Sequence, residues 1–301
     1  MFGTLFFKPK SAIRVTNLND VYVANGVIID QADKTKIINL KNIKRLAHSN
    51  NGRLFVLDFV GDVMASQAEA LSQEVNAILA AGNPNLDQVL IRLESPGGAV
   101  HVYGYASSQL QRIRNAGYDM TVAVDKVAAS GGYMMACIAH NIISAPYAIV
   151  GSIGVVSEFM NFNTLLESIG INYKQYTAGK YKRTVGPLGP ITVEAEAKFN
   201  SDLDRVHRLF KDHVKKFRNS LDIDEIATGE YWYGLDAKER GLVDQILPSD
   251  DFIIQALSKK EVLHIQYIPH RSFGDKLRLG FVKAIKDVAL EMISTYMHLR
   301  L

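Results

Sequence analysis

Cysteine is almost absent from the sequence, because Cys137 is the only one among 301 residues. A single cysteine excludes an intrachain disulfide, and no Cys/His cluster with the spacing of a zinc site occurs, so no metal site is expected. Cys137 falls on a predicted helix, where a small buried hydrophobic side chain is a better interpretation than a nucleophile.

A surplus of charge of one sign is also missing. The 34 basic and 31 acidic residues leave a formal net charge of +3, which is too small to predict nucleic-acid binding. Neither the GxGxxG nor the GxxxxGK(S/T) spacing of phosphate-binding loops occurs, although the chain contains 22 glycines. The glycine-rich stretch at 97–98 is therefore not interpreted as a phosphate loop.

The sequence also lacks a hydrophobic run long enough to cross a bilayer. The apolar stretch from Met1 to Phe7 is too short for a transmembrane helix or for the apolar part of a signal peptide, so we expect a soluble polypeptide. What is present is an ordinary globular composition, with 48% hydrophobic and 22% charged residues. This composition predicts one large α/β domain or two small ones.

Regular strand and helix patterns begin at Arg53. The predicted order is a strand at 53–59, a helix at 66–81, a strand at 88–93, a helix at 103–115 and a strand at 121–124. Such an alternation favours parallel strands joined by crossover helices. Residues 1–50 are predicted to form an appendage of uncertain structure, with short β-like runs at 21–23 and 26–29 and a solvated basic stretch at 41–45.

A serine lies at the corner between the strand at 121–124 and a helix that begins near Tyr133. Gly131 and Gly132 allow a sharp turn and the close approach of a substrate. A hydroxyl at Ser130 faces helix N–H groups, which favour the negative charge that forms when a serine attacks a carbonyl. Ser130 is therefore a candidate nucleophile, although a plain serine N-cap explains the same residue types without any chemistry.

The preceding strand ends in a second glycine-rich loop, Ser95-Pro96-Gly97-Gly98. Such a loop can present unpaired backbone N–H groups to an oxyanion, whereas a tight Pro-Gly turn accounts for it equally well. Because both loops follow strands of one parallel sheet, we expect them at the same carboxyl edge, facing each other across a cleft.

Five sequence segments occur in an order that is typical of one peptidase family. They are LESPGG at 93–98, VDKVAASGGY at 124–133, GSIGV at 151–155, YTAGKYKR at 176–183, and ATGEYWYG at 227–234 followed by GLVD at 241–244. Together they resemble the signal peptide peptidase A family of bacterial serine peptidases and, within it, the SohB branch. The resemblance covers residues 53–265 without a break.

The resemblance implies an α/β fold of the Clp-protease/crotonase type, built from repeated ββα units with helices covering the sheet. The catalytic domain would span residues 51–268. A Ser-Lys dyad is implied, in which Ser130 is the nucleophile and Lys182 is the general base. Supporting roles are implied for Ser152, which would orient the lysine, and for an oxyanion hole formed by Gly97, Gly98 and Gly131.

A lysine can act as a general base only when it is neutral. Because an ordinary lysine has a pKa of about 10.4, burial in a closed apolar cleft has to lower that pKa by about three units. Without the family pattern, residues 180–183 would be interpreted as a solvated basic stretch. A Ser130–His101–Asp125 triad is an alternative, because His101 follows the Gly-Gly loop and is a candidate for lining the pocket.

Two amphipathic helices are predicted in the rest of the chain. The helix at 191–217 is expected to cover the sheet or a neighbouring subunit, and the C-terminal helix at 269–301 packs on a subunit or domain or lies on a membrane. The resemblance implies a ring or dome of several copies and a bacterial protein that is inner-membrane-associated or cytoplasmic. The N-terminal transmembrane helix and lysine-rich linker of the SohB branch are not seen in this sequence.

These interpretations predict a serine endopeptidase that hydrolyses peptides or unfolded protein through an acyl-enzyme, without a metal or organic cofactor. Signal-peptide remnants or other membrane-derived peptides are the expected substrates. Two alternatives share the fold. One is a crotonase-like acyl-CoA enzyme, which needs acidic residues in the cleft and a CoA groove, and the other is a catalytically silent oligomeric scaffold.

Overall fold

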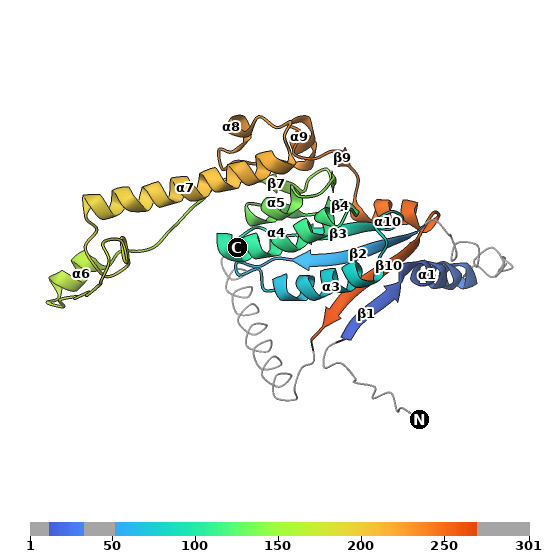
Figure 1. Cartoon of the computed structure of the whole chain (residues 1–301), viewed down its shortest axis with the longest axis horizontal. Coiled ribbons are helices and arrows are strands. Elements are labelled where there is room, and N and C mark those ends of the chain that lie inside the picture. Colours follow the sequence, from blue (N-terminus) through green and yellow to red (C-terminus); the bar gives the residue numbers. More distant parts are fainter. Residues whose placement is uncertain (1–11, 33–51, 270–301) are drawn as a thin grey trace, which may run out of the picture.

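The computed structural model describes residues 12–32 and 52–269 of the chain (Figure 1). The strands of its large sheet are β1 (Ala12–Asn17), β2 (Arg53–Val60), β3 (Gln88–Glu94), β4 (Asp119–Val124), β6 (Asn141–Ser144), β9 (Gln245–Ile246) and β10 (Glu261–Ile268). Their order across the sheet is β1-β10-β2-β3-β4-β6-β9. Neighbouring strands are parallel except β1, which pairs antiparallel with β10.

The central strands are buried on both faces, as their nearly unbroken apolar runs require. On β2, Phe55 and Leu57 face one core, whereas Leu54 and Val56 face the other. Helices α3 (Ala68–Ala81), α4 (Val100–Asn115) and α5 (Gly131–Ala136) cover the first face, and α10 (Ser249–Leu257) covers the second. The predicted α/β architecture with helices covering the sheet is confirmed.

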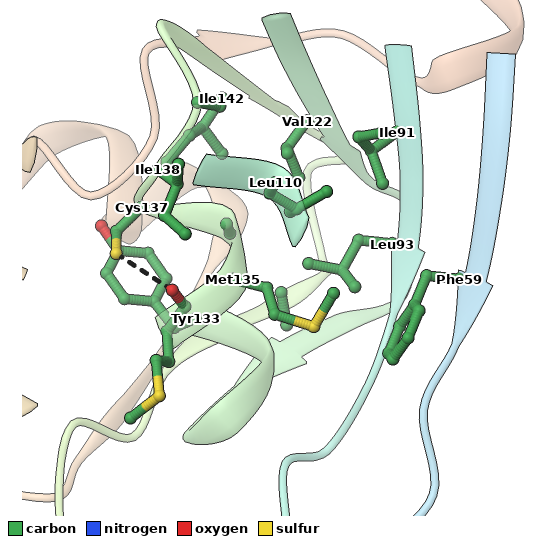
Figure 2. Close-up of a cluster of buried hydrophobic side chains, with 14 of the residues drawn as sticks. Phe59, Ile91, Leu93, Leu110, Val122, Tyr133, Met135, Cys137, Ile138 and Ile142 are labelled. Carbon is green, nitrogen blue, oxygen red and sulfur yellow. Dashed lines mark hydrogen bonds between the residues drawn. The ribbon is translucent and has the colours of Figure 1, made fainter. Parts of the chain in front are cut away.

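Figure 2 shows part of the larger core, where side chains of β2, β3 and β4 meet those of α4 and α5. Cys137 lies in this core with no exposed surface, and burial raises the pKa of its thiol far above the ordinary value. A thiol that stays protonated is a poor nucleophile. The interpretation of Cys137 as a small buried hydrophobic residue is therefore confirmed.

A second, smaller sheet stands at the carboxyl edge of the large one. Its strands, in the order β5-β7-β8, are β5 (Val127–Ala129), β7 (Ile149–Gly151) and β8 (Tyr231–Tyr233). Short helices α8 (Ile223–Ile226) and α9 (Gly234–Glu239) flank β8 in the sequence. Because β5 ends at Ala129 and α5 begins at Gly131, Ser130 lies at a strand-to-helix corner, as the sequence predicted.

The N-terminal residues differ from the sequence-based expectation. The β-like runs predicted at 21–23 and 26–29 are wrong, because both lie in helix α1 (Leu18–Ala32). The helix begins where the Asn17 side chain accepts a hydrogen bond from the Asp20 N–H, which satisfies one of the free N–H groups of the first turn. Strand β1 places residues 12–17 in the large sheet, beside β10.

A long extension leaves the body of the molecule after β7. It consists of residues 155–192, called the arm below, which include α6 (Asn163–Ser168) and contain no buried residue. The chain returns through α7 (Val193–Phe217), the helix predicted at 191–217, of which only Phe210 and Val214 are buried. In Figure 1 the arm lies beside the N-terminal end of α7, away from the large sheet.

Two predicted segments lie outside the described residues, namely the basic stretch at 41–45 and nearly all of the C-terminal helix predicted at 269–301. Within 12–32 and 52–269, no helix is both long and apolar enough to cross a membrane.

A buried carboxylate beneath the sheet makes the stability of the fold sensitive to pH. Glu74 of α3 is 6% exposed, and its Oε1 accepts the Tyr267 N–H at 2.8 Å, whereas its Oε2 has no partner among the described residues. Burial raises the pKa of Glu74 to about 7. The folded state therefore holds a proton that the unfolded chain releases, so the free energy of unfolding falls as the pH rises from about 4.5 to about 7.

We expect Glu74→Gln to remove this cost, because the amide keeps the shape of the side chain and carries no charge. At pH 8 the free energy of unfolding should rise by roughly 2–3 kcal/mol over the wild type, and the gain should disappear near pH 4.5. Urea unfolding of both proteins at the two pH values measures the difference. An equal effect at both pH values would contradict the assignment.

Candidate active site

The corner at Ser130 has an uncommon backbone conformation. Its φ is 52° and its ψ is −118°, and few residues other than glycine adopt a positive φ. Two hydrogen bonds hold the corner: the Ser130 N–H donates to the Gly151 carbonyl at 2.8 Å, and the Met134 N–H donates to the Ser130 carbonyl at 2.9 Å. The hydroxyl makes no capping hydrogen bond to α5, so the plain N-cap interpretation is wrong.

The loop after β3 lies directly against this corner. Gly97 has a φ of +91°, and a Cβ atom placed on it would lie 2.6 Å from the Cβ of Ser130 and 2.7 Å from the Gly131 nitrogen. No side chain fits in that space, so glycine is required for the approach. The expectation that the two glycine-rich loops face each other is therefore confirmed.

Two backbone hydrogen bonds fix the approach of the two loops. Ser95 forms a parallel bridge with Ala128 of β5, in which the Ser95 N–H donates to the Val127 carbonyl at 2.8 Å and the Ala129 N–H donates to the Ser95 carbonyl at 3.0 Å. The end of β3 is thus paired with β5, the strand that leads to Ser130. The spacing between Gly97 and Ser130 follows from this pairing.

Both loops keep backbone N–H groups free at this contact. Within the described part of the chain, the N–H groups of Gly98 and Gly131 donate to no acceptor. The N–H of Gly97, in contrast, donates to the Oγ of Ser95 at 3.1 Å. Gly97 therefore contributes the space for the approach, whereas Gly98 and Gly131 each keep a free N–H group beside it.

Ser152 directly follows β7, the strand whose last residue, Gly151, accepts the Ser130 N–H. It also has a positive φ of 51°, and its N–H donates to the Glu230 carbonyl at 2.7 Å. Because Gly151 accepts the N–H of Ser130, the two serines are linked through a single residue. The predicted orienting serine is thus brought to the site.

Lys182 is not brought to the site within one chain. It is exposed in the arm, next to Tyr181, whose ring lies 5.5 Å from the Lys198 amine on α7. His207 of α7 touches the body, where its Nε2 is 3.2 Å from the Ile153 carbonyl. At 1.5 Å per residue, Lys198 lies about 14 Å from His207 along α7, toward the N-terminal end of the helix.

The alternative triad is not assembled either. His101 is exposed on the first turn of α4 and makes no hydrogen bond among the described residues. Asp125 accepts hydrogen bonds from both the N–H and the hydroxyl of Ser249, at the start of α10. Its carboxylate is occupied by that helix start. No group of three or more His, Cys, Asp or Glu side chains in the described ranges could hold a metal ion.

Family models match most of the chain. The model described as "Peptidase family S49 N-terminal" matches residues 8–110, and the model described as "Peptidase family S49" matches residues 112–263. The chain belongs to peptidase family S49.

Curated S49 relatives cover nearly the whole sequence. A probable protease SohB of Buchnera aphidicola subsp. Acyrthosiphon pisum (strain APS) is 42% identical over 304 residues, which cover 97% of this chain and 90% of that protein. A probable protease SohB of Haemophilus influenzae is 46% identical over 257 residues, covering 85% and 71%. A mutant of the 1510-N membrane-bound stomatin-specific protease, solved with a substrate peptide, is 14% identical with a TM-score of 0.48, covering 79% of this chain and 100% of that one.

S49 membership, with SohB proteases as relatives, identifies the chain as a serine-type endopeptidase. The resemblance stated from the sequence motifs is therefore confirmed, and so is the predicted enzyme class. Neither the acyl-CoA enzyme nor the silent scaffold is supported.

The sequence analysis missed the structural role of two residues near Ser130. Ser95 was treated only as part of a glycine-rich loop, and Tyr103 only as the start of a helix, yet their side chains meet beneath Gly97. One signal was available: a tyrosine on the buried stripe of a helix has to find a hydrogen-bond partner for its hydroxyl.

Proposed function

We propose that this peptidase cleaves peptide bonds through an acyl-enzyme on Ser130, with Lys182 as the base and the N–H groups of Gly98 and Gly131 as the oxyanion hole. The observation that carries the proposal is the contact between Gly97 and Ser130, beside which these two N–H groups are free. Donors fixed before the reaction stabilise the charge that develops on the carbonyl oxygen.

The reaction follows from these roles. The Ser130 oxygen attacks the carbonyl carbon while its proton passes to the neutral lysine amine, and the carbonyl oxygen becomes the oxyanion. The protonated amine then gives this proton to the leaving nitrogen, and the C–N bond breaks. Water, deprotonated by the same amine, releases the acid and restores the serine.

The position of Lys182 supports a site shared between two copies of the chain. The arm that carries it buries none of its residues, although it is rich in large apolar side chains. Those that are exposed are Val156, Phe159, Met160, Phe162, Leu165, Ile169, Ile171, Tyr173, Tyr176, Tyr181, Leu188 and Ile191. An exposed apolar surface of this extent is typical of a protein–protein interface. Packing of the arm against a neighbour would also supply the burial that a lysine base needs.

Peptides and unfolded segments are the proposed substrates, because a Ser-Lys site enclosed by several copies admits only extended chains. Among them we include signal-peptide remnants and membrane-derived peptides, cleaved in the cytoplasm or at the inner membrane of a bacterium. The SohB proteases among the relatives support a proteolytic role without naming a substrate.

A serine-directed fluorophosphonate probe tests the proposed dyad. We expect the wild type to be labelled, Ser130→Ala to lose all labelling, and Lys182→Ala to be labelled at least about 100-fold more slowly, because an unassisted serine is a weak nucleophile. Lys180→Ala is the matched control, since Lys180 lies two residues away and pairs with Glu194. Labelling is followed by gel fluorescence and intact mass.

Either of two outcomes would overturn the assignment. Labelling that survives Ser130→Ala removes the nucleophile, and equal rates for Lys182→Ala and Lys180→Ala remove the base. A His101→Ala variant labelled like the wild type would complete the case against the triad.

A further inference from the structure

A buried side-chain pair lies beneath the oxyanion loop. Ser95, at the end of β3, and Tyr103, on the second turn of α4, both have no exposed surface. The Ser95 Oγ and the Tyr103 hydroxyl oxygen are 2.6 Å apart. Two backbone groups complete the cluster, namely the Gly97 N–H, 3.1 Å from the Ser95 Oγ, and the Asp62 carbonyl, 2.8 Å from the Tyr103 hydroxyl.

The donors and acceptors in this cluster form one directed chain. The Tyr103 hydroxyl donates to the Asp62 carbonyl, which accepts only, so the Ser95 hydroxyl has to donate to the Tyr103 oxygen. A lone pair of the Ser95 oxygen then accepts the Gly97 N–H. Burial raises the pKa of Tyr103 above its ordinary value, which keeps this hydroxyl protonated and able to donate.

The same tyrosine also touches the second half of the oxyanion hole. A Cβ atom placed on Gly131 would lie 2.4 Å from the Cγ of Tyr103, so the ring packs directly against the backbone of Gly131. On the other side, the Ala99 N–H donates to the Val63 carbonyl at 2.9 Å, next to Asp62. One side chain therefore braces both backbone segments that carry the free N–H groups.

We propose that Tyr103, acting through Ser95, is a positioning residue that sets the spacing between the Gly98 and Gly131 N–H groups. The proposal rests on the proposed role of these two groups as the oxyanion hole. The hydroxyl chain holds the Gly97–Gly98 peptide, and the ring holds Gly131. Neither side chain touches the reacting atoms, so both act on the transition state only through the backbone.

The test compares Tyr103→Phe and Ser95→Ala with Tyr118→Phe. The control removes an equally buried hydroxyl, which donates to the Ile78 carbonyl at 3.2 Å in another part of the fold. For an internally quenched peptide that the wild type cleaves, we expect Tyr103→Phe and Ser95→Ala to lower kcat by about 10- to 100-fold at nearly unchanged KM. Tyr118→Phe should leave both constants within about twofold of the wild type.

Two further measurements separate positioning from a general loss of structure. Affinity for a peptide boronate, whose tetrahedral adduct places an oxygen in the hole, should weaken in proportion to kcat/KM. The double variant Tyr103→Phe/Ser95→Ala should lose no more activity than the worse single variant, because both belong to one chain of hydrogen bonds. Thermal unfolding of Tyr103→Phe should match that of Tyr118→Phe.

The proposal is overturned if Tyr103→Phe and Ser95→Ala keep kcat within twofold of Tyr118→Phe, or if their boronate affinity is unchanged. Should Tyr103→Phe fail to fold, Ser95→Ala alone decides the question. If instead the proposed mechanism with Ser130 as the nucleophile were wrong, Ser130→Ala would remain active. An inactive Ser130→Ala beside fully active Tyr103→Phe and Ser95→Ala would refute the positioning role alone.

Discussion

Subunits carrying Ser130→Ala and subunits carrying Lys182→Ala are expected to recover peptide hydrolysis when assembled together, although each variant alone loses it by on the order of 10⁴-fold or more. In a closed assembly with repeated head-to-tail contacts, a 1:1 mixture should restore about a quarter of the wild-type sites. A working site needs its serine from a Lys182→Ala chain and its lysine from a neighbouring Ser130→Ala chain. The measurement is the hydrolysis rate of co-expressed chains purified through two different tags.

The physical reason is the separation of the two residues within one chain. Ser130 is fixed at the corner by its hydrogen bond to Gly151, whereas Lys182 is exposed in an arm that buries none of its residues. Within one chain, the Lys182 amine therefore lacks the apolar surroundings that a lysine base needs. Contact of the arm with a second copy would correct both the distance and the hydration.

The matched control for this experiment mixes Lys182→Ala chains with chains that carry both substitutions. That mixture contains intact serines and no Lys182, so it should stay inactive. Purification through both tags shows whether the Ser130→Ala and Lys182→Ala chains have assembled together. If they assemble and hydrolysis does not recover, Lys182 acts on the Ser130 of its own chain or takes no part in the reaction.

The parts of the fold that the sequence predicted well are those with strong local signals. The strands at 53–59 and 88–93 are apolar runs, and the structure extends each by one residue, to Val60 and Glu94. The corner at Ser130 could be predicted because a strand pattern, two glycines and a helix pattern meet there. Local chemistry alone decides such features.

Features that depend on contacts between distant residues could not be predicted. The runs at 21–23 and 26–29 have β-like composition, yet they lie in α1. The first turn of this helix is hydrogen-bonded to residues near the C-terminal end of the described chain. There Asn19 donates to the Leu257 carbonyl and accepts the Val262 N–H. A buried side chain that bonds strand β10 outweighs the weak β-propensity of runs of three or four residues.

In the candidate site, too, the local features could be predicted and the contacts between distant segments could not. Its glycines and serine were predicted from the motif order, whereas the hydroxyl chain beneath them joins Asp62, Ser95 and Tyr103, which come from three separate segments. The position of the lysine was predicted by motif as well. Its distance from the serine is a property of the arm, which no local pattern in the sequence describes.

Replacement of Gly97 by alanine is expected to lower kcat/KM by on the order of 10³-fold. The added methyl group would lie 2.6 Å from the Cβ of Ser130 and 2.8 Å from the Ala129 carbonyl, and both belong to a backbone held by strand pairing. The loop has to retreat, and the Gly98 N–H retreats with it. Steady-state hydrolysis of the quenched peptide, with thermal unfolding of the same samples, measures the effect.

Gly104→Ala is the matched control, because it adds the same methyl group seven residues along the chain, in the exposed part of α4, where nothing lies within 4 Å. A glycine inside a helix costs up to about 1 kcal/mol relative to alanine, so this control should be slightly more stable and fully active. Gly97→Ala should be less stable as well, because a φ of +91° strains any side chain. If Gly97→Ala kept more than a tenth of wild-type kcat/KM, the loop would accommodate the added methyl group. The contact between Gly97 and Ser130 would then not be what positions the Gly98 N–H.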